Sequence, residues 1–243
     1  MFFSSSYSTT WRPGRQVGVG IFCFLFTSFF DILKVMIITY FGKQFFKITQ
    51  GDLTIALNPV GRESRLAGQV PRFGADIALS SVNHPDYNGS SQMSHGERQP
   101  LSINSPGEYE VHGVLINGFS VPTEIDGKKY LNTIFSFKVD EMNLCFLGAL
   151  KNTVLPAEVL EELDSPDVLF IPLGTLAPAT VYKLATTLEA KLVIPMDYDD
   201  KSLKMFLKEA GAEDQKPEEK LMLKRKDLEE KDGDVVVLTP ARQ

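Results

Sequence analysis

A change of pattern near residue 150 is the feature that most limits the fold. Before it, short β-branched and aromatic runs are separated by Gly, Pro, Asn and Asp, and such runs predict strands. After it, amphipathic helical segments alternate with short apolar runs. Strands are expected over residues 35–40, 45–49, 53–57, 75–79, 103–105, 109–111, 114–118, 131–139, 142–147, 168–172, 192–195, 220–224 and 235–238, and helices over 156–163, 177–188 and 201–210. Many strands with helices inserted late predict two packed sheets covered by helices.

Composition limits the domain count and the class of partner. A chain of 243 residues with 43% hydrophobic content can bury a full core, most simply as one domain. The net charge is −6 and the basic residues alternate with acidic ones, so nucleic acid is not an expected partner. Cys23 and Cys145 lie far apart in apolar runs, which is typical of buried thiols and fits a cytoplasmic protein.

Residues 1–35 differ from the rest of the chain. A Ser/Thr-rich stretch, Arg12 and Arg15 precede a nearly continuous apolar run over 17–30. Three interpretations stay open: an upstream extension of a chain that starts at Met36, an N-terminal membrane anchor, or a signal peptide. Asp31 and Lys34 disfavour a longer spanning helix. A membrane is an expected partner only if this segment is an anchor, and the folded domain is expected over 36–243.

The segment 75–88 joins an apolar strand to a turn that carries His84 and Asp86. It resembles the "His-x-His-x-Asp-His" metal-binding loop of the metallo-β-lactamase superfamily. On that pattern Val82 stands at the first His position, His84 at the second, Asp86 at the Asp and Tyr87 at the last His. The resemblance therefore implies that half of this loop's ligand set is replaced.

Further stretches resemble the branch of small zinc-dependent hydrolases in that superfamily: 37–59, 105–114, 143–150 and 193–198. The resemblance covers residues 36–239 and implies an α/β fold, a four-layer αββα sandwich of two mixed β-sheets flanked by helices. It also implies departures from the family pattern at Lys43 and Gln44 (for His-Ser), Asn58 (for Asp), Phe146 (for His), Ala149 (for the bridging Asp) and Asp197 (for the final His).

Only a reduced set of metal ligands survives on this pattern. A catalytic zinc ion takes about three protein ligands and a water molecule. Val82, Phe146 and Ala149 offer no lone pair, and the phenol of Tyr87 is a poor zinc ligand because its ordinary pKa is about 10. His84, Asp86 and Asp197 remain as a residual metal site for zinc or Mn²⁺. They also suit ordinary roles: a hydrogen-bonding loop residue, a turn cap and a solvent-facing strand end.

Two hypotheses for function follow. The first is a degenerate, metal-free pseudo-hydrolase that acts as a binding or interaction module for a small molecule or protein. The alternative is an active metal-dependent hydrolase of a phosphodiester, lactone or similar ester, which uses the reduced metal site. The sequence assigns no catalytic residue, no substrate and no cofactor other than a metal ion.

Overall fold

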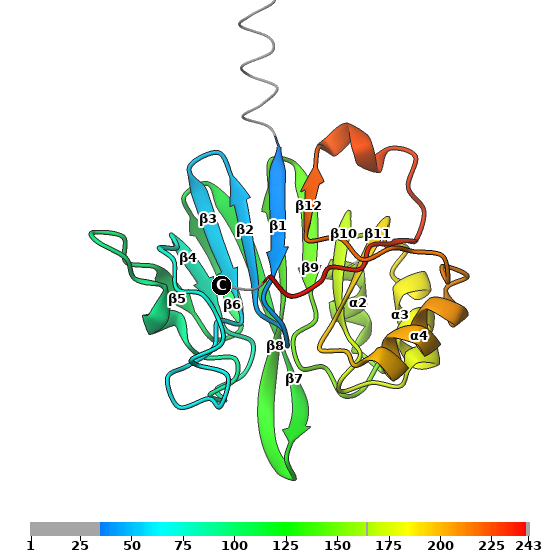
Figure 1. Cartoon of the computed structure of the whole chain (residues 1–243), viewed down its shortest axis with the longest axis horizontal. Coiled ribbons are helices and arrows are strands. Elements are labelled where there is room, and N and C mark those ends of the chain that lie inside the picture. The colour runs from blue at the N-terminus through cyan, green and yellow to red at the C-terminus, as the bar shows by residue number, and fades with distance from the viewer. Residues whose placement is uncertain (1–34, 164, 242–243) are drawn as a thin grey trace, which may run out of the picture. The chain divides into compact units, whose positions relative to one another are not determined.

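Two mixed β-sheets face each other in the computed structural model, which describes residues 35–163 and 165–241 (Figure 1). The interpretations of the N-terminal segment fall on residues 1–34, which lie outside the described residues. Within the described residues, no helix combines the length and the apolar character needed to cross a membrane.

The first sheet has six strands in the order β12-β1-β2-β3-β4-β5. Their bounds are β1 Met36–Tyr40, β2 Phe46–Gln50, β3 Leu53–Leu57, β4 Ile77–Leu79, β5 Leu101–Ile103 and β12 Lys220–Leu223. Strands β12, β1, β2 and β3 pair antiparallel, and β3, β4 and β5 pair parallel. Gly51 closes the β2–β3 hairpin at a φ of +56°, a conformation that glycine adopts without a steric penalty. The predicted turn at this glycine is thus confirmed.

The second sheet has seven strands in the order β13-β11-β10-β9-β8-β7-β6. Their bounds are β6 Gly107–Val111, β7 Val114–Ile125, β8 Lys128–Val139, β9 Met142–Phe146, β10 Val168–Pro172, β11 Leu192–Met196 and β13 Asp234–Val235. Strands β9, β10, β11 and β13 are parallel, and β6 to β9 are antiparallel. All residues of β10 and β11 are buried, as expected for parallel strands covered on both faces.

The hairpin β7–β8 extends well beyond the strands expected over 114–118 and 131–139 (Figure 1). Asp126 and Gly127 form its turn at φ values of +50° and +75°. An Asp-Gly pair with positive φ at both positions is the preferred two-residue hairpin connection. The outer part of the hairpin, which includes Ile125 and Tyr130, therefore extends beyond the rest of the sheet.

The main core lies between the two sheets. Phe46 of β2 meets Phe170 of β10 edge to face at 4.9 Å between ring centroids, and both rings are fully buried. Helices α2 (Ala157–Glu162), α3 (Pro178–Thr187) and α4 (Asp200–Glu209) lie on the outer side of the seven-stranded sheet, where a second apolar cluster forms.

Irregular chain covers the outer face of the six-stranded sheet. A third apolar cluster there joins Phe45, Ala56 and Ala78 to Val70 and Met93, the last on the short 3₁₀ helix η1 (Ser90–Met93). A second 3₁₀ helix, η2 (Arg225–Leu228), follows β12. Two mixed sheets with few helices confirm the predicted fold class.

Candidate functional site

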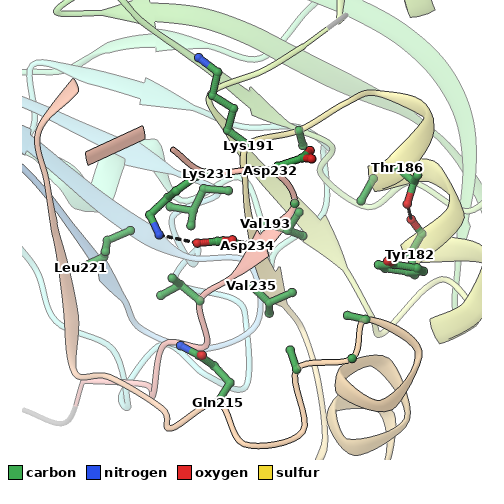
Figure 2. A pocket seen from close by; sticks show the side chains of 18 of the residues that line it. Tyr182, Thr186, Lys191, Val193, Gln215, Leu221, Lys231, Asp232, Asp234 and Val235 are labelled. Atoms are coloured by element: carbon green, nitrogen blue, oxygen red, sulfur yellow. Dashed lines mark hydrogen bonds and ion pairs between the residues drawn. The ribbon is translucent and has the colours of Figure 1, made fainter. Parts of the chain in front are cut away.

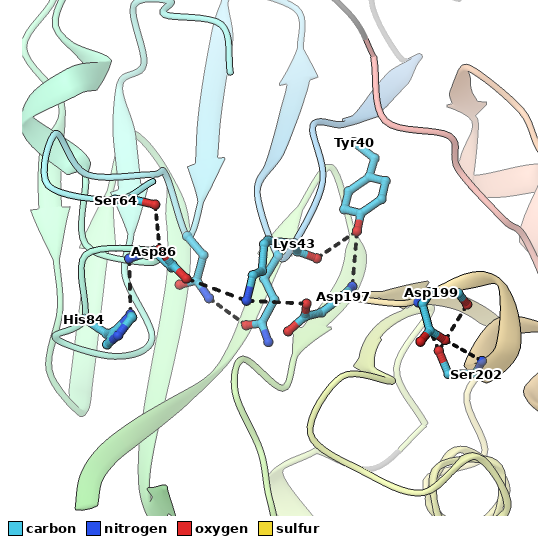
Figure 3. A network of polar contacts seen from close by, with 10 residues as sticks. Tyr40, Lys43, Ser64, His84, Asp86, Asp197, Asp199 and Ser202 are labelled. Atoms are coloured by element: carbon cyan, nitrogen blue, oxygen red, sulfur yellow. Dashed lines mark hydrogen bonds and ion pairs between the residues drawn. The ribbon is translucent and has the colours of Figure 1, made fainter. Parts of the chain in front are cut away.

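The residues that the family resemblance singles out gather at one edge of the sandwich. Strands β1, β3 and β4 run in the same direction, so their carboxyl ends share an edge of the first sheet. Strands β9 and β11 both run parallel to β10 and end together in the second sheet. The segments that follow these strands therefore come together, and Figure 3 shows their polar side chains. Binding sites commonly lie beyond the carboxyl ends of parallel strands.

The ammonium group of Lys43 lies between two carboxylates (Figure 3). Its Nζ is 3.6 Å from Oδ2 of Asp86 and 3.9 Å from Oδ1 of Asp197. The side chains are 38% exposed for Lys43, 22% for Asp86 and 16% for Asp197, so both carboxylates are largely shielded from water. The Nζ atom is also 5.9 Å from the ring centroid of Tyr87, within the range of a cation–π contact.

Hydrogen bonds to the main chain of Lys43 and Asp197 fix this contact between the two sheets. The Asp197 amide donates to the Lys43 carbonyl at 2.6 Å. The Tyr40 hydroxyl donates to the same carbonyl at 2.8 Å and accepts from the Asp197 amide at 3.1 Å. Lys43 and Asp197 both have positive φ, +54° and +52°. Non-glycine residues adopt this conformation only where their surroundings hold them in it.

Burial dominates the electrostatics of Asp197. Desolvation raises the pKa of this carboxyl above its ordinary value, the positive charge of Lys43 and the side chain of Gln44 oppose the rise, and the charge of Asp86 adds to it. The interpretation of Asp197 as a solvent-facing strand end is wrong, because a strand of the other sheet and its turn cover the residue.

His84 and Asp86 make hydrogen bonds within their own loop and with Ser64 of a neighbouring loop. The Asp86 amide donates to Nδ1 of His84 at 3.2 Å. Ser64 donates its hydroxyl to Oδ1 of Asp86 at 2.5 Å, so this carboxylate binds Ser64 and Lys43 and is not the expected turn cap. The hydrogen bond from the Asp86 amide fits the interpretation of His84 as a hydrogen-bonding loop residue. The His84 ring also meets the ring of Tyr130 edge to face at 5.7 Å between ring centroids.

Three of the positions where the resemblance places metal ligands form an apolar cluster instead. Val82, Tyr87 and Ala149 are at most 2% exposed and pack together, with Ile125 and Tyr130 of the β7–β8 hairpin against them. Burial raises the pKa of the Tyr87 phenol, and the charge of Asp197 adds to this rise. The phenol therefore stays protonated at neutral pH and is a poor metal ligand.

A buried amide network lies behind these residues. The Ser81 amide donates to Oδ1 of Asn58 at 2.6 Å, which leaves the Asn58 Nδ2 to donate to Oε1 of Gln44 at 2.9 Å and to Oγ of Ser81 at 2.8 Å. Nε2 of Gln44 makes no hydrogen bond of normal geometry with any described residue. Asn132 supports the facing sheet in the same manner, because it donates to the Leu147 carbonyl and accepts from the Ala149 amide.

The residues at this edge do not suit a zinc or manganese ion. Among residues 35–163 and 165–241, no group of three His, Cys, Asp or Glu side chains is close enough together to hold a metal ion. His84, Asp86 and Asp197 lie on the same edge, but a lysine ammonium, which has no lone pair to give, separates the two carboxylates. Two carboxylates thus lie at this edge, as in a metal site, but the described residues do not arrange them around a common ion position.

One cavity borders the candidate site, and another lies away from it. A cavity of about 860 Å³ borders Lys43 on the side of Phe41, Leu66 and Pro240. A larger groove of about 1440 Å³ lies where β11 and β13 begin, and Lys191, Asp232 and Asp234 are among its polar residues (Figure 2). Because Asp197 follows the opposite end of β11, the larger groove is not part of the candidate site.

Comparisons with known proteins identify the family. Residues 37–197 match the model of the beta-lactamase superfamily domain, so the chain belongs to the beta-lactamase superfamily. A candidate Zn-dependent hydrolase of the metallo-beta-lactamase superfamily from Thermotoga maritima is 29% identical, with a TM-score of 0.62 over 84% of this chain and 98% of its own. A search of curated proteins finds no match.

More distant structures share the fold. A candidate metal-dependent hydrolase from Parabacteroides distasonis is 15% identical, with a TM-score of 0.58 over 84% of this chain and 94% of its own. A metallo-beta-lactamase fold protein from Bacillus subtilis is 12% identical, with a TM-score of 0.55 over 86% and 97%. The chain is thus a metallo-β-lactamase-fold protein related to candidate metal-dependent hydrolases.

Proposed function

We propose that this protein is a metal-free member of its superfamily that binds a small molecule or a protein and does not hydrolyse it. The observation that carries the proposal is the apolar cluster of Val82, Tyr87 and Ala149 at positions where the family resemblance places metal ligands. Packed aliphatic and protonated phenolic groups cannot activate a water molecule, which needs a Lewis acid or a general base.

The alternative is an active metal-dependent hydrolase with a reduced site of His84, Asp86 and Asp197. Its support is the 29% identity with a protein described as a candidate Zn-dependent hydrolase. This alternative requires Lys43 to leave the space between the carboxylates, since an ion and an ammonium group repel each other there.

Metal content and turnover test the two functions together. The full chain is purified, incubated with zinc or manganese, desalted, and measured by elemental mass spectrometry and with a phosphodiester and a lactone substrate. We expect much less than one metal ion per chain, and no turnover beyond that of the matched His84→Ala variant. Stoichiometric metal and turnover that both disappear in His84→Ala would overturn the proposal in favour of the hydrolase.

A further inference from the structure

The two carboxylates at the candidate site need a positive charge between them. Asp86 and Asp197 approach from different sheets, and each is mostly shielded from water. Like charges in such surroundings repel strongly, because the effective dielectric constant is well below that of water. In a metalloenzyme the ion supplies the balancing charge. Among the residues that the structure describes, the cation paired with both carboxylates is Lys43.

The position of Lys43 is fixed by its main chain rather than by its long side chain. Its carbonyl accepts hydrogen bonds from Tyr40 and from the Asp197 amide. The same amide belongs to one of the two acids that the ammonium group neutralises. The main-chain contact and the ion pair therefore support each other, and the ammonium group stays near both carboxylates at a high effective concentration.

We propose that Lys43 is a tethered cation that takes the place of a metal ion between Asp86 and Asp197 and joins the two sheets at this edge. This inference rests on the proposed metal-free function and deepens it. An ammonium group balances charge and donates hydrogen bonds, but it cannot coordinate a water molecule for attack. It also excludes a divalent ion from the same space. Removal of Lys43 then makes the domain responsive to an added divalent cation.

Thermal unfolding of charge variants tests this role. In the presence of EDTA, we expect Lys43→Ala to lower the Tm by about 3–8 °C, because two shielded carboxylates lose their partner. Millimolar MnCl₂ should restore at least half of the loss, since Mn²⁺ accepts carboxylate ligands and can then balance the charges of Asp86 and Asp197 in the space that the lysine leaves. The wild-type Tm should not change with MnCl₂. Lys43→Arg, which keeps the charge, should unfold near the wild-type temperature.

A matched control separates this effect from the loss of any lysine. Nζ of Lys151 lies 3.1 Å from Oε1 of Glu124, and both side chains are about half exposed. Such a surface pair contributes little, so Lys151→Ala should leave the Tm within about 2 °C of the wild type and unresponsive to MnCl₂.

A double variant keeps the test decisive if Lys43→Ala does not fold. Lys43→Ala combined with Asp197→Asn removes one charge of each sign, so it should be more soluble and more stable than Lys43→Ala alone. The inference is overturned if Lys43→Ala unfolds at the wild-type temperature, or if neither Asp197→Asn nor MnCl₂ improves it. Those results leave the proposed metal-free function standing, whereas metal bound stoichiometrically by the wild type overturns both.

Discussion

Gly174 is the residue on which the close approach of the chain to Asp197 depends. A Cβ atom at this position would lie 2.6 Å from the Asp197 carbonyl oxygen and 2.7 Å from Oδ2 of its carboxylate. No side chain fits these distances without displacing Asp197. The glycine is required here for space, because its φ is not in the left-handed region.

We therefore expect Gly174→Ala to destabilise the protein by about 1–3 kcal/mol, as other small-to-large changes at packed positions do. Urea unfolding followed by circular dichroism measures the change. Gly68→Ala is the matched control, since a Cβ there meets no atom within 4 Å and the backbone is not left-handed. Equal stability of the two variants would contradict the close contact at Gly174.

The sequence marks the individual residues of the site but not their partners. Lys43, Gln44 and Asn58 are recognisable as departures from a family pattern, yet nothing local predicts that Lys43 meets Asp86 and Asp197. Those contacts depend on the positive φ of two non-glycine residues and on the packing of one sheet against the other. The hydrogen bond between Gln44 and Asn58 cannot be predicted from the sequence either, because segments distant in sequence bury both side chains.

At the scale of elements, the β7–β8 hairpin packs against the candidate site. Its Tyr130 packs against the cluster of Val82, Tyr87 and Ala149 and meets the ring of His84. The hairpin thus covers the loop that carries His84 and Asp86.

Removal of the Tyr130 ring should expose the loop that carries His84 and Asp86. We expect Tyr130→Ala to increase hydrogen exchange at the amides of residues 82–84, 86 and 87, because the loop loses an aromatic neighbour. Mass spectrometry of peptides from this loop measures the exchange rates. Tyr182→Ala removes a partly exposed ring from α3 and serves as the control. Unchanged exchange in Tyr130→Ala would show that the hairpin does not protect the loop.

Most elements follow from local pattern, and the exceptions have physical causes. Strands β10 and β11 are continuous apolar runs of strand length, so their positions are predictable from sequence. The outer half of the β7–β8 hairpin is not, because Pro122, Glu124 and Lys129 give it the composition of a loop. Cross-strand hydrogen bonds over its full length make it a strand pair nonetheless. The expected loop over 85–99 contains the helix η1, whose Met93 packs on the first sheet.

At the scale of the whole molecule, the boundary of the domain is a separate prediction. Strand β1 begins at Met36 and is held between β2 and β12, so it is an internal strand of the first sheet.

We propose that residues 36–243 fold without the segment before them. A chain of these residues should give the circular dichroism spectrum of a mixed α/β protein and a Tm within about 3 °C of that of the full chain. A chain that starts at Phe41 is the control. It lacks β1 and should not fold, because β2 and β12 both lose their hydrogen bonds to β1. Failure of residues 36–243 to fold would contradict this boundary.

The lysine between two acids has a consequence for how such a protein responds to its environment. An ion bound from solution can be lost to a chelator, and a site that suits one divalent metal generally prefers copper when copper is present. A cation that belongs to the polypeptide cannot be exchanged or stripped away, and it is present from the moment of synthesis. Zinc starvation and mismetallation would therefore leave the charge balance at this edge of the fold unchanged.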